Sequence, residues 1–300
     1  MKLIIIMALT LFIIASCHRY RFPSTTNYAN SEIKNETNQT ILAGHCSINM
    51  LQASGYKEWF DKSYNGYAVD TEIVAKLKPL LQHKTIEIFL GSWCGDSKRE
   101  VPRMLKILAA ADFDTSNVKL IFVDNSTATY KQSPQHEEAG KNIHHVPTFI
   151  FYNGKKEMNR IVESPIVSLE KDALAILQKQ AYAPNYKAIT YWQKNVKSKQ
   201  VLMVDLQLQQ LAETIKPLCK HSGELNALGY ILLAQKSNVE AINIFKLNAA
   251  IYPEKATVYD SLGEAYYTMD NKEDAKKCYE KVLRIDPSNA NAKMMLEKIK

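Results

Sequence analysis

The stretch GSWCGDSKRE, residues 91–100, places a single cysteine, Cys94, between an apolar segment and a charged one. The preceding residues 85–91 (TIEIFLG) are rich in β-branched and apolar side chains, which favours a strand. From residue 95 to about residue 111, apolar side chains recur at helical spacing. Cys94 is therefore expected where a strand ends and a helix begins. Free backbone N–H groups and the helix dipole at such a position favour the thiolate form of a cysteine.

Side chains next to Cys94 act on its charge in opposite directions. Asp96 disfavours a second negative charge close by, whereas Lys98 and Arg99 offset that effect. Ser97 lies one helical turn beyond Cys94, and its hydroxyl can donate a hydrogen bond to a thiolate. The sequence therefore predicts a reactive thiol at Cys94.

Strands and helices alternate on both sides of this stretch, over residues 71–183, and a helical lead-in with aromatic side chains begins at residue 56. The expected elements are a helix at 71–81, a strand at 85–91, a helix at 95–111, a strand at 118–124, a short polar helix near 134–142, strands at 148–154 and 157–163, and a helix at 168–180. Asn153-Gly154 supplies a tight turn between the last two strands. This order predicts an α/β domain with a mixed sheet.

The order of these elements around Trp93-Cys94-x-x-Ser97, with Val146-Pro147 opening the third strand, resembles the thioredoxin fold. The resemblance implies that Cys94 is the attacking thiolate within a motif that includes Trp93 and Ser97. It also implies that Pro147 follows a cis peptide bond and that Val146-Pro147 presents a backbone edge to a substrate chain. Ser97 stands where the dithiol members carry a second, resolving cysteine, so the motif cannot resolve its own mixed disulfide. The alternative is a thioredoxin-like scaffold whose cysteine is merely buried.

The N-terminus carries the features of a secretory signal, with Lys2 before a short apolar run. The four residues ending this run, Ile14-Ala15-Ser16-Cys17, resemble the lipobox of bacterial lipoproteins. The resemblance implies that residues 1–16 are removed, that Cys17 is lipidated, and that the protein is anchored in the bacterial cell envelope, facing the periplasm. An ordinary cleaved signal with an incidental cysteine is the alternative.

Residues 17–55 are rich in Asn, Thr and Ser, and predict a tether between the anchor and the α/β domain at 56–183. Cys46 lies near the end of this tether, where a mobile segment could bring it to Cys94 as the resolving partner. A free cysteine is the alternative, because disulfide geometry cannot be judged from sequence.

The other cysteine and histidine residues give weaker indications of function. His144 and His145, just before Val146, are candidates for a base or cation near the thiolate, or for loop residues that pack at a rim. Cys219 and Cys278 lie on helical patterns and are expected in the core. Without any Cys-x-x-Cys pair, we expect no metal site and no cofactor.

The C-terminal third repeats itself with a period of 34 residues. Five positions recur: Leu228-Gly229, Ala241, Phe245 and Pro253 return as Leu262-Gly263, Ala275, Tyr279 and Pro287. This pattern resembles tetratricopeptide repeats and implies two helix pairs plus a capping helix over residues 222–300, joined to the α/β domain by a helical linker at 184–221. Such arrays bind a protein partner or serve as docking and spacing modules.

Composition narrows the function further. The chain has 300 residues, 46% of them hydrophobic and 23% charged, which suits a globular protein of about two domains. Its net charge of +7 is spread thinly, so nucleic-acid binding is not expected. Two functions compete. The first is an envelope thiol-disulfide oxidoreductase that engages client cysteines through Cys94 in exchange, reduction or isomerisation. The second is a non-catalytic adaptor in which both domains only bind other proteins.

Overall fold

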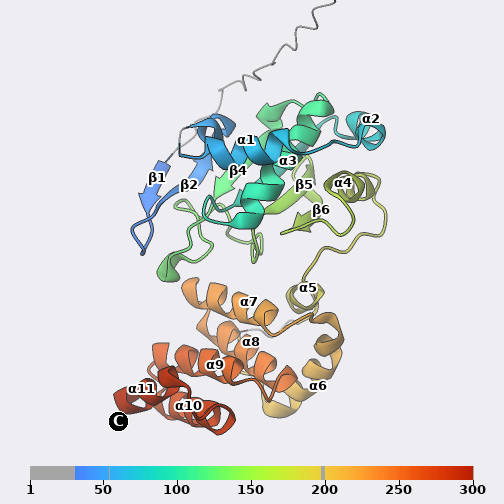
Figure 1. The fold of residues 1–300 in the computed structure, drawn as a ribbon. Coiled ribbons are helices and arrows are strands. Elements are labelled where there is room, and N and C mark those ends of the chain that lie inside the picture. Colours follow the sequence, from blue (N-terminus) through green and yellow to red (C-terminus); the bar gives the residue numbers. More distant parts are fainter. Residues whose placement is uncertain (1–30, 54, 197–199, 300) are drawn as a thin grey trace, which may run out of the picture.

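The protein combines an α/β region with a helical C-terminal region that lies against one side of it (Figure 1). The structure is a computed structural model that describes residues 31–53, 55–196 and 200–299. The signal sequence at 1–16 and the lipidation site Cys17 lie outside the described residues. Among the described residues, no helix is long and apolar enough to cross a membrane.

The α/β region is built on a mixed sheet of six strands in the order β1-β2-β4-β3-β5-β6. The strands are β1 (Ser31–Lys34), β2 (Thr40–Cys46), β3 (Lys84–Leu90), β4 (Val118–Phe122), β5 (Thr148–Asn153) and β6 (Lys156–Val162). Only β3 and β4 pair in parallel, and every other pair is antiparallel. β3 lies between β4 and β5, so it is an interior strand. The residues that follow its carboxyl end therefore start near the middle of the sheet and away from its outer strands.

Four α-helices cover one face of this sheet (Figure 1). They are α1 (Lys57–Asn65), α2 (Thr71–Leu80), α3 (Gly95–Ala110) and α4 (Leu169–Leu177). Side chains alternate between the two faces along a strand, so Ile86, Ile88 and Leu90 of β3 join the helices in the main core, whereas Phe89 points to the other face. The expected helices and strands of this region lie within a few residues of these bounds, with one exception.

The exception is the short polar helix expected near 134–142, which is wrong. Residues 131–147 instead form a series of turns that cover the second face of the sheet, where Ile143 and Val146 pack against Phe89. His136 and Asn142 have positive φ angles of 56° each, which a helix does not allow. Side chains here accept hydrogen bonds from backbone N–H groups in place of the backbone carbonyls of a helix. The backbone N–H of Ser133, for example, donates to a carboxylate oxygen of Glu138 at 2.9 Å.

The tether expected over 17–55 is also wrong for its described part, because β1 and β2 form an antiparallel hairpin that extends the sheet. The Asn- and Thr-rich residues 35–39 are the turn of this hairpin. The Asn35 side-chain oxygen accepts hydrogen bonds from the backbone N–H groups of Thr37 (3.2 Å) and Gln39 (2.7 Å), and Asn38 has a φ of 62°. The polar residues that indicated a tether therefore have the usual turn chemistry of Asn.

The described part of the C-terminal region contains α-helices and one short 3₁₀ turn, and no strand. Its helices are α5 (Lys187–Asn195), α6 (Asp205–Ile215), α7 (Gly223–Ala234), α8 (Asn238–Ile251), α9 (Ala256–Thr268), α10 (Lys272–Ile285) and α11 (Ala290–Ile299). The structure also describes four 3₁₀ turns. Three lie in the α/β region, at Ile48–Gln52, Thr115–Asn117 and Thr127–Thr129, and one lies in the C-terminal region, at Lys216–Leu218. The expected helical linker, two helix pairs and capping helix all have counterparts here.

The two helix pairs, α7 with α8 and α9 with α10, make the same close contact 34 residues apart. A Cβ at Gly229 would lie 2.5 Å from the Phe245 ring, and a Cβ at Gly263 would lie 3.0 Å from the Tyr279 ring. Glycine lets the two helices of each pair approach closely, and the aromatic ring fills the space. This contact explains why Gly and an aromatic residue recur in the sequence.

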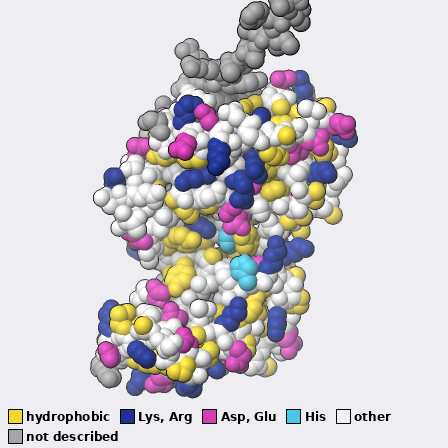
Figure 2. Space-filling model, in the orientation of Figure 1, with side chains coloured by type: hydrophobic (Ala, Val, Ile, Leu, Met, Phe, Trp, Pro, Cys, Tyr) yellow, Lys and Arg dark blue, Asp and Glu magenta, His cyan; other side chains and the backbone are white. Residues whose placement is uncertain are grey.

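The helical region has cores of its own. α5 to α9 share one apolar cluster together with Cys278 of α10, and α9 to α11 share another. Neither cluster includes residues of the sheet. Basic and acidic side chains are scattered over the visible face of both regions, and histidine side chains gather where the regions meet (Figure 2).

Candidate functional site

Cys94 lies where the sequence places it, between the end of β3 and the first residue of α3. It is the N-cap residue of α3, with extended backbone angles (φ −88°, ψ 126°). Its side chain is half-buried, and its Sγ lies 3.2 Å from the backbone oxygen of Val146. The thiol is therefore at the positive end of a 16-residue helix and remains in part accessible to solvent.

Val146 and Pro147 face Cys94 from the start of β5. The Val146–Pro147 peptide bond is cis, as the resemblance implies. The Val146 carbonyl is the acceptor for the Cys94 thiol, and the Pro147 carbonyl accepts from the backbone N–H of Glu163 at 2.7 Å. The structure thus brings together the cysteine and the proline segment, which are 52 residues apart in sequence.

Trp93 and Ser97 shape the turn that carries Cys94. The Trp93 indole N–H donates to the backbone oxygen of Val123 at 2.8 Å, and a Cβ at Gly91 would lie 2.5 Å from the Trp93 ring. Ser97 is 1% exposed, and its Oγ accepts from the backbone N–H of Gly91 at 3.2 Å. The hydrogen bond found for Ser97 therefore fixes the turn, whereas the sequence predicted one to the Cys94 thiolate.

The charged residues at the start of α3 pair with one another. Arg99 donates to Asp96 at 2.6 Å and to Glu100 at 2.6 Å. The sequence analysis expected the negative charge of Asp96 to disfavour a thiolate at Cys94. The ion pair with Arg99 neutralises much of that charge. Because Arg99 is engaged with both carboxylates, it is not the cation that faces the sulfur.

Lys131 is a buried cation close to Cys94 that the sequence analysis did not identify. It is only 5% exposed, and its Nζ donates to the backbone oxygen of His144 at 2.9 Å. Burial lowers the pKa of Lys131 to about 8, and the neighbouring charges of Cys94 and Glu163 act in the opposite direction. Lys131 is a single lysine in a polar segment, so nothing in the local sequence distinguishes it from a surface lysine.

His144 and His145 are not the cations that the sequence allowed for. Burial, reinforced by the positive charges of Lys131 and Arg160, lowers the pKa of His144 to about 3. The pKa of His145 is lowered as well, first by burial and then by its charged neighbours. Their Nδ1 atoms lie 2.8 Å apart, and the His145 ring stacks on Tyr186 with centroids 3.7 Å apart. Both imidazoles are neutral at pH 7, so Lys131 supplies the positive charge here.

Cys46 does not lie on a mobile segment, and that part of the expectation is wrong. It ends β2, pairs with Leu120 of β4, and is 0% exposed in the main core. Its Sγ lies 3.7 Å from the backbone oxygen of Ala43. Cys94 packs instead at the cluster on the opposite face of the sheet. Cys46 could meet Cys94 only if β2 left the sheet.

The other two described cysteines belong to the helical region. Burial raises the pKa of Cys219 to about 11 and that of Cys278 to about 12. None of the four described cysteines forms a disulfide bond. Since a thiol reacts as its thiolate, Cys219 and Cys278 are poor nucleophiles at neutral pH. No group of three or more side chains suited to a metal ion occurs within the described ranges.

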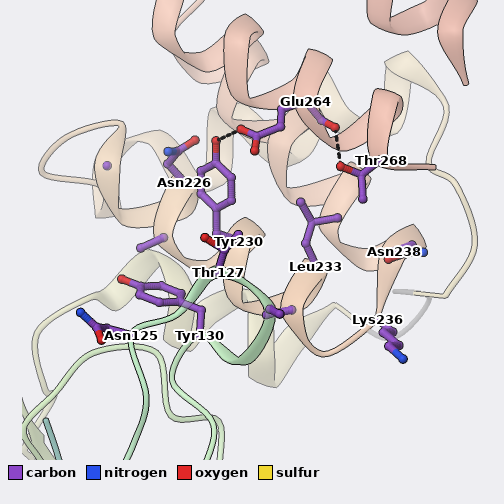
Figure 3. Close-up of a pocket in the computed structure, with 14 residues that line it drawn as sticks. Asn125, Thr127, Tyr130, Asn226, Tyr230, Leu233, Lys236, Asn238, Glu264 and Thr268 are labelled. Carbon is purple, nitrogen blue, oxygen red and sulfur yellow. Dashed lines mark hydrogen bonds between the residues drawn. The ribbon is translucent and has the colours of Figure 1, made fainter. Parts of the chain in front are cut away.

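A cavity of about 810 Å³ lies where the α/β region meets the helical region (Figure 3). One wall is the loop at residues 125–130, and the other is formed by α7, the start of α8 and the end of α9. Tyr130 lines the cavity from the loop side and Tyr230 from the helix side. We call this space the inter-region groove.

Comparison with known proteins bears on the helical region. No curated protein matches the chain. The family model described as a tetratricopeptide repeat matches residues 256–289, which comprise α9, α10 and the turn after them. The α/β region with its six-stranded sheet is thus followed by a helical region that contains a tetratricopeptide repeat, a unit whose presence indicates interaction with protein partners.

Proposed function

We propose that the α/β region is a thioredoxin-like domain in which Cys94 exchanges disulfides with client proteins. The observation that carries this proposal is the position of the thiol, which caps a helix and faces the Val146 carbonyl before Pro147. Such a position favours the thiolate and leaves a backbone edge beside it for a substrate chain.

The exchange has two steps. The Cys94 thiolate attacks one sulfur of a client disulfide, a new disulfide joins Cys94 to that sulfur, and the other client sulfur leaves as a thiolate that takes a proton from water. A second thiol, from the client or from a small thiol compound, then attacks the mixed disulfide and releases Cys94. Ser97 has no sulfur and Cys46 is buried in the core, so release depends on this external thiol.

Cys94 alkylation by iodoacetamide tests the proposal in the purified full chain, with Cys94→Ser as the background. We expect Cys94 to react at pH 7 at least several-fold faster than the same residue in the urea-unfolded chain, because only the folded state has the helix and Lys131 beside the sulfur. A rate equal to that of the unfolded chain, or no labelling when folded, would favour the adaptor function instead. The tetratricopeptide repeat is the observation that supports an adaptor.

Replacing Lys131 by methionine should slow this alkylation by about three- to tenfold at pH 7, since one buried charge is removed near the sulfur. The pKa of Lys131 is about 8, so the ammonium is charged at pH 7 and mostly neutral above pH 9. The ratio of wild-type to Lys131→Met rates should therefore be largest below pH 8 and approach one above pH 9. Lys98→Met, on the more exposed start of α3, is the matched control and should change the rate less. A constant ratio across this range would contradict the role of Lys131.

Membrane anchoring is proposed from the sequence alone, since Cys17 lies outside the described residues. Ile14-Ala15-Ser16-Cys17 behind an apolar run supports removal of residues 1–16, lipidation of Cys17 and attachment in the bacterial envelope, facing the periplasm. Mass spectrometry of the protein from its native membrane should find an acylated Cys17 as the first residue. Release of a chain with unmodified Cys17 into the soluble fraction would contradict this.

A further inference from the structure

The loop wall of the inter-region groove is held in place by hydrogen bonds. The Asp124 carboxylate accepts from the hydroxyl of Thr129 at 2.6 Å, which closes the loop on itself. The Glu36 carboxylate, from the turn of the β1–β2 hairpin, accepts from the backbone N–H of Thr127 at 2.9 Å. The loop at 125–130 is thus closed on itself and bonded to the hairpin turn, and its groove-facing side chains are arranged before a ligand binds.

The helical wall carries polar side chains that are paired with one another. The Tyr230 hydroxyl donates to the Glu264 carboxylate at 2.7 Å, and the Thr268 hydroxyl donates to the Glu264 backbone oxygen at 2.9 Å (Figure 3). The Asn226 side-chain oxygen, also at the groove, is buried and accepts no hydrogen bond from any described residue.

The groove reaches the neighbourhood of the Cys94 thiol through Tyr130. Tyr130 lines the groove, and the ammonium of the next residue, Lys131, lies 5.1 Å from the centre of its ring. The Lys131 ammonium donates to the His144 carbonyl at 2.9 Å, and two residues further on the Val146 carbonyl lies 3.2 Å from the Cys94 sulfur. A chain that occupies the groove beside Tyr130 is therefore near the reactive sulfur.

We infer that the inter-region groove binds an extended, largely uncharged segment of the client polypeptide whose disulfide Cys94 attacks. This inference rests on the proposed function. The side chains that face the groove are mainly amides, hydroxyls, tyrosines and small apolar groups, with one lysine and one glutamate. Such a lining matches peptide N–H and C=O groups and small side chains. It lacks the clustered cations that phosphate or nucleic acid would need.

The size and position of the groove agree with this occupant. About 810 Å³ is at the upper end of the range for ligand sites, and more than a single side chain can fill. The α/β loop and the repeat helices contribute one wall each, so neither region alone contains the site. The repeat helices would therefore help to select the client, whereas the Cys94 thiol would carry out the exchange.

Two matched disulfides test the inference in the full chain. One is cysteine carrying a pyridylthio group, and the other is the same residue at the centre of an uncharged peptide of about 12 residues, about 40 Å long when extended. In both, the Cys94 thiolate attacks the cysteine sulfur and expels pyridinethione, whose absorbance gives the rate. We expect the peptide to react about tenfold faster than the free amino acid derivative, which corresponds to about 1.4 kcal/mol of additional binding.

Ala234→Trp on α7 and Ala128→Trp on the loop each place a large ring in the groove, from opposite walls. Each should bring the peptide rate down to that of the free derivative while changing the free derivative's own rate less than about twofold. Ala110→Trp, at the far end of α3, is the matched control and should change neither rate. Circular dichroism checks that each variant is folded, and the two walls provide independent tests.

The outcomes separate the groove from the thiol. If the free derivative reacts quickly with wild type but the peptide gains nothing, or if neither folded tryptophan variant lowers the peptide's advantage, the groove inference is wrong and the thiol chemistry stands. If the free derivative reacts no faster with folded than with unfolded wild type, the proposed function fails, and the inference fails with it.

Discussion

Changing Cys94 to serine should remove the protein's disulfide-linked complexes entirely, as seen on non-reducing gels of cells whose thiols are quenched rapidly with acid. Cys94 is the half-exposed cysteine that caps a helix. Cys46 is buried in the core, and burial raises the pKa of Cys219 and Cys278, so these thiols should not replace it at neutral pH. The change from sulfur to oxygen is nearly isosteric, so the fold should be kept.

Cys278→Ser is the matched control and should leave the complexes unchanged, since its thiol is in the helical core. Two results would contradict the proposed exchange reaction. One is a set of complexes that persists in Cys94→Ser. The other is the absence of complexes from wild type after the same quench. Either would favour the adaptor function.

Ser97→Cys should lower the yield of the same complexes, because it places a second thiol one helical turn from Cys94 and allows the motif to resolve itself. Ser97 is 1% exposed beside the Gly91 backbone, so a side chain of similar size is needed there. Ser97→Ala is the control: it removes the hydroxyl without adding a thiol, and complexes should persist. An equal fall in both variants would show that the turn geometry, rather than resolution, had changed.

The sequence predicted best those features that depend on local pattern. A run rich in β-branched and apolar residues identified β3, and helical spacing identified α3, so the position of Cys94 at their junction followed. The recurrence of Gly229 and Phe245 as Gly263 and Tyr279 identified the repeats, because a close helix contact needs a small residue facing a large one.

The sequence predicted poorly the features that depend on distant contacts. The turn at 35–39 looks like a tether because its polar residues satisfy backbone groups within the turn, and only the pairing of β2 with β4 makes this hairpin part of the sheet. Lys131 becomes a buried cation through folding of the turns at 131–147 over the sheet, which bonds its ammonium to the His144 carbonyl. Neither contact has a local sequence pattern.

Changing Phe245 to alanine should destabilise the helical region by about 3–5 kcal/mol, the usual cost of deleting a fully buried aromatic side chain. Phe245 is 0% exposed, its ring occupies the space that Gly229 leaves open, and it packs edge-on against Tyr230 with centroids 5.3 Å apart. Alanine would leave a cavity between α7 and α8 that two helices joined by a short turn cannot readily close.

Urea unfolding followed by circular dichroism measures the free-energy change, with Cys94 alkylation as a separate report on the α/β region. Tyr267→Ala is the matched control, because this ring is only half-buried at the end of α9 and should contribute about 1 kcal/mol or less. The apolar clusters of the two regions are separate, so Phe245→Ala should shift the unfolding of the helices, while the fast alkylation of Cys94 should persist to the same urea concentration as in wild type. Loss of both at one midpoint would show that the regions unfold as a single unit, joined through the contacts at the inter-region groove. A cost below about 1 kcal/mol would show that the Gly229–Phe245 contact does not hold the repeats together.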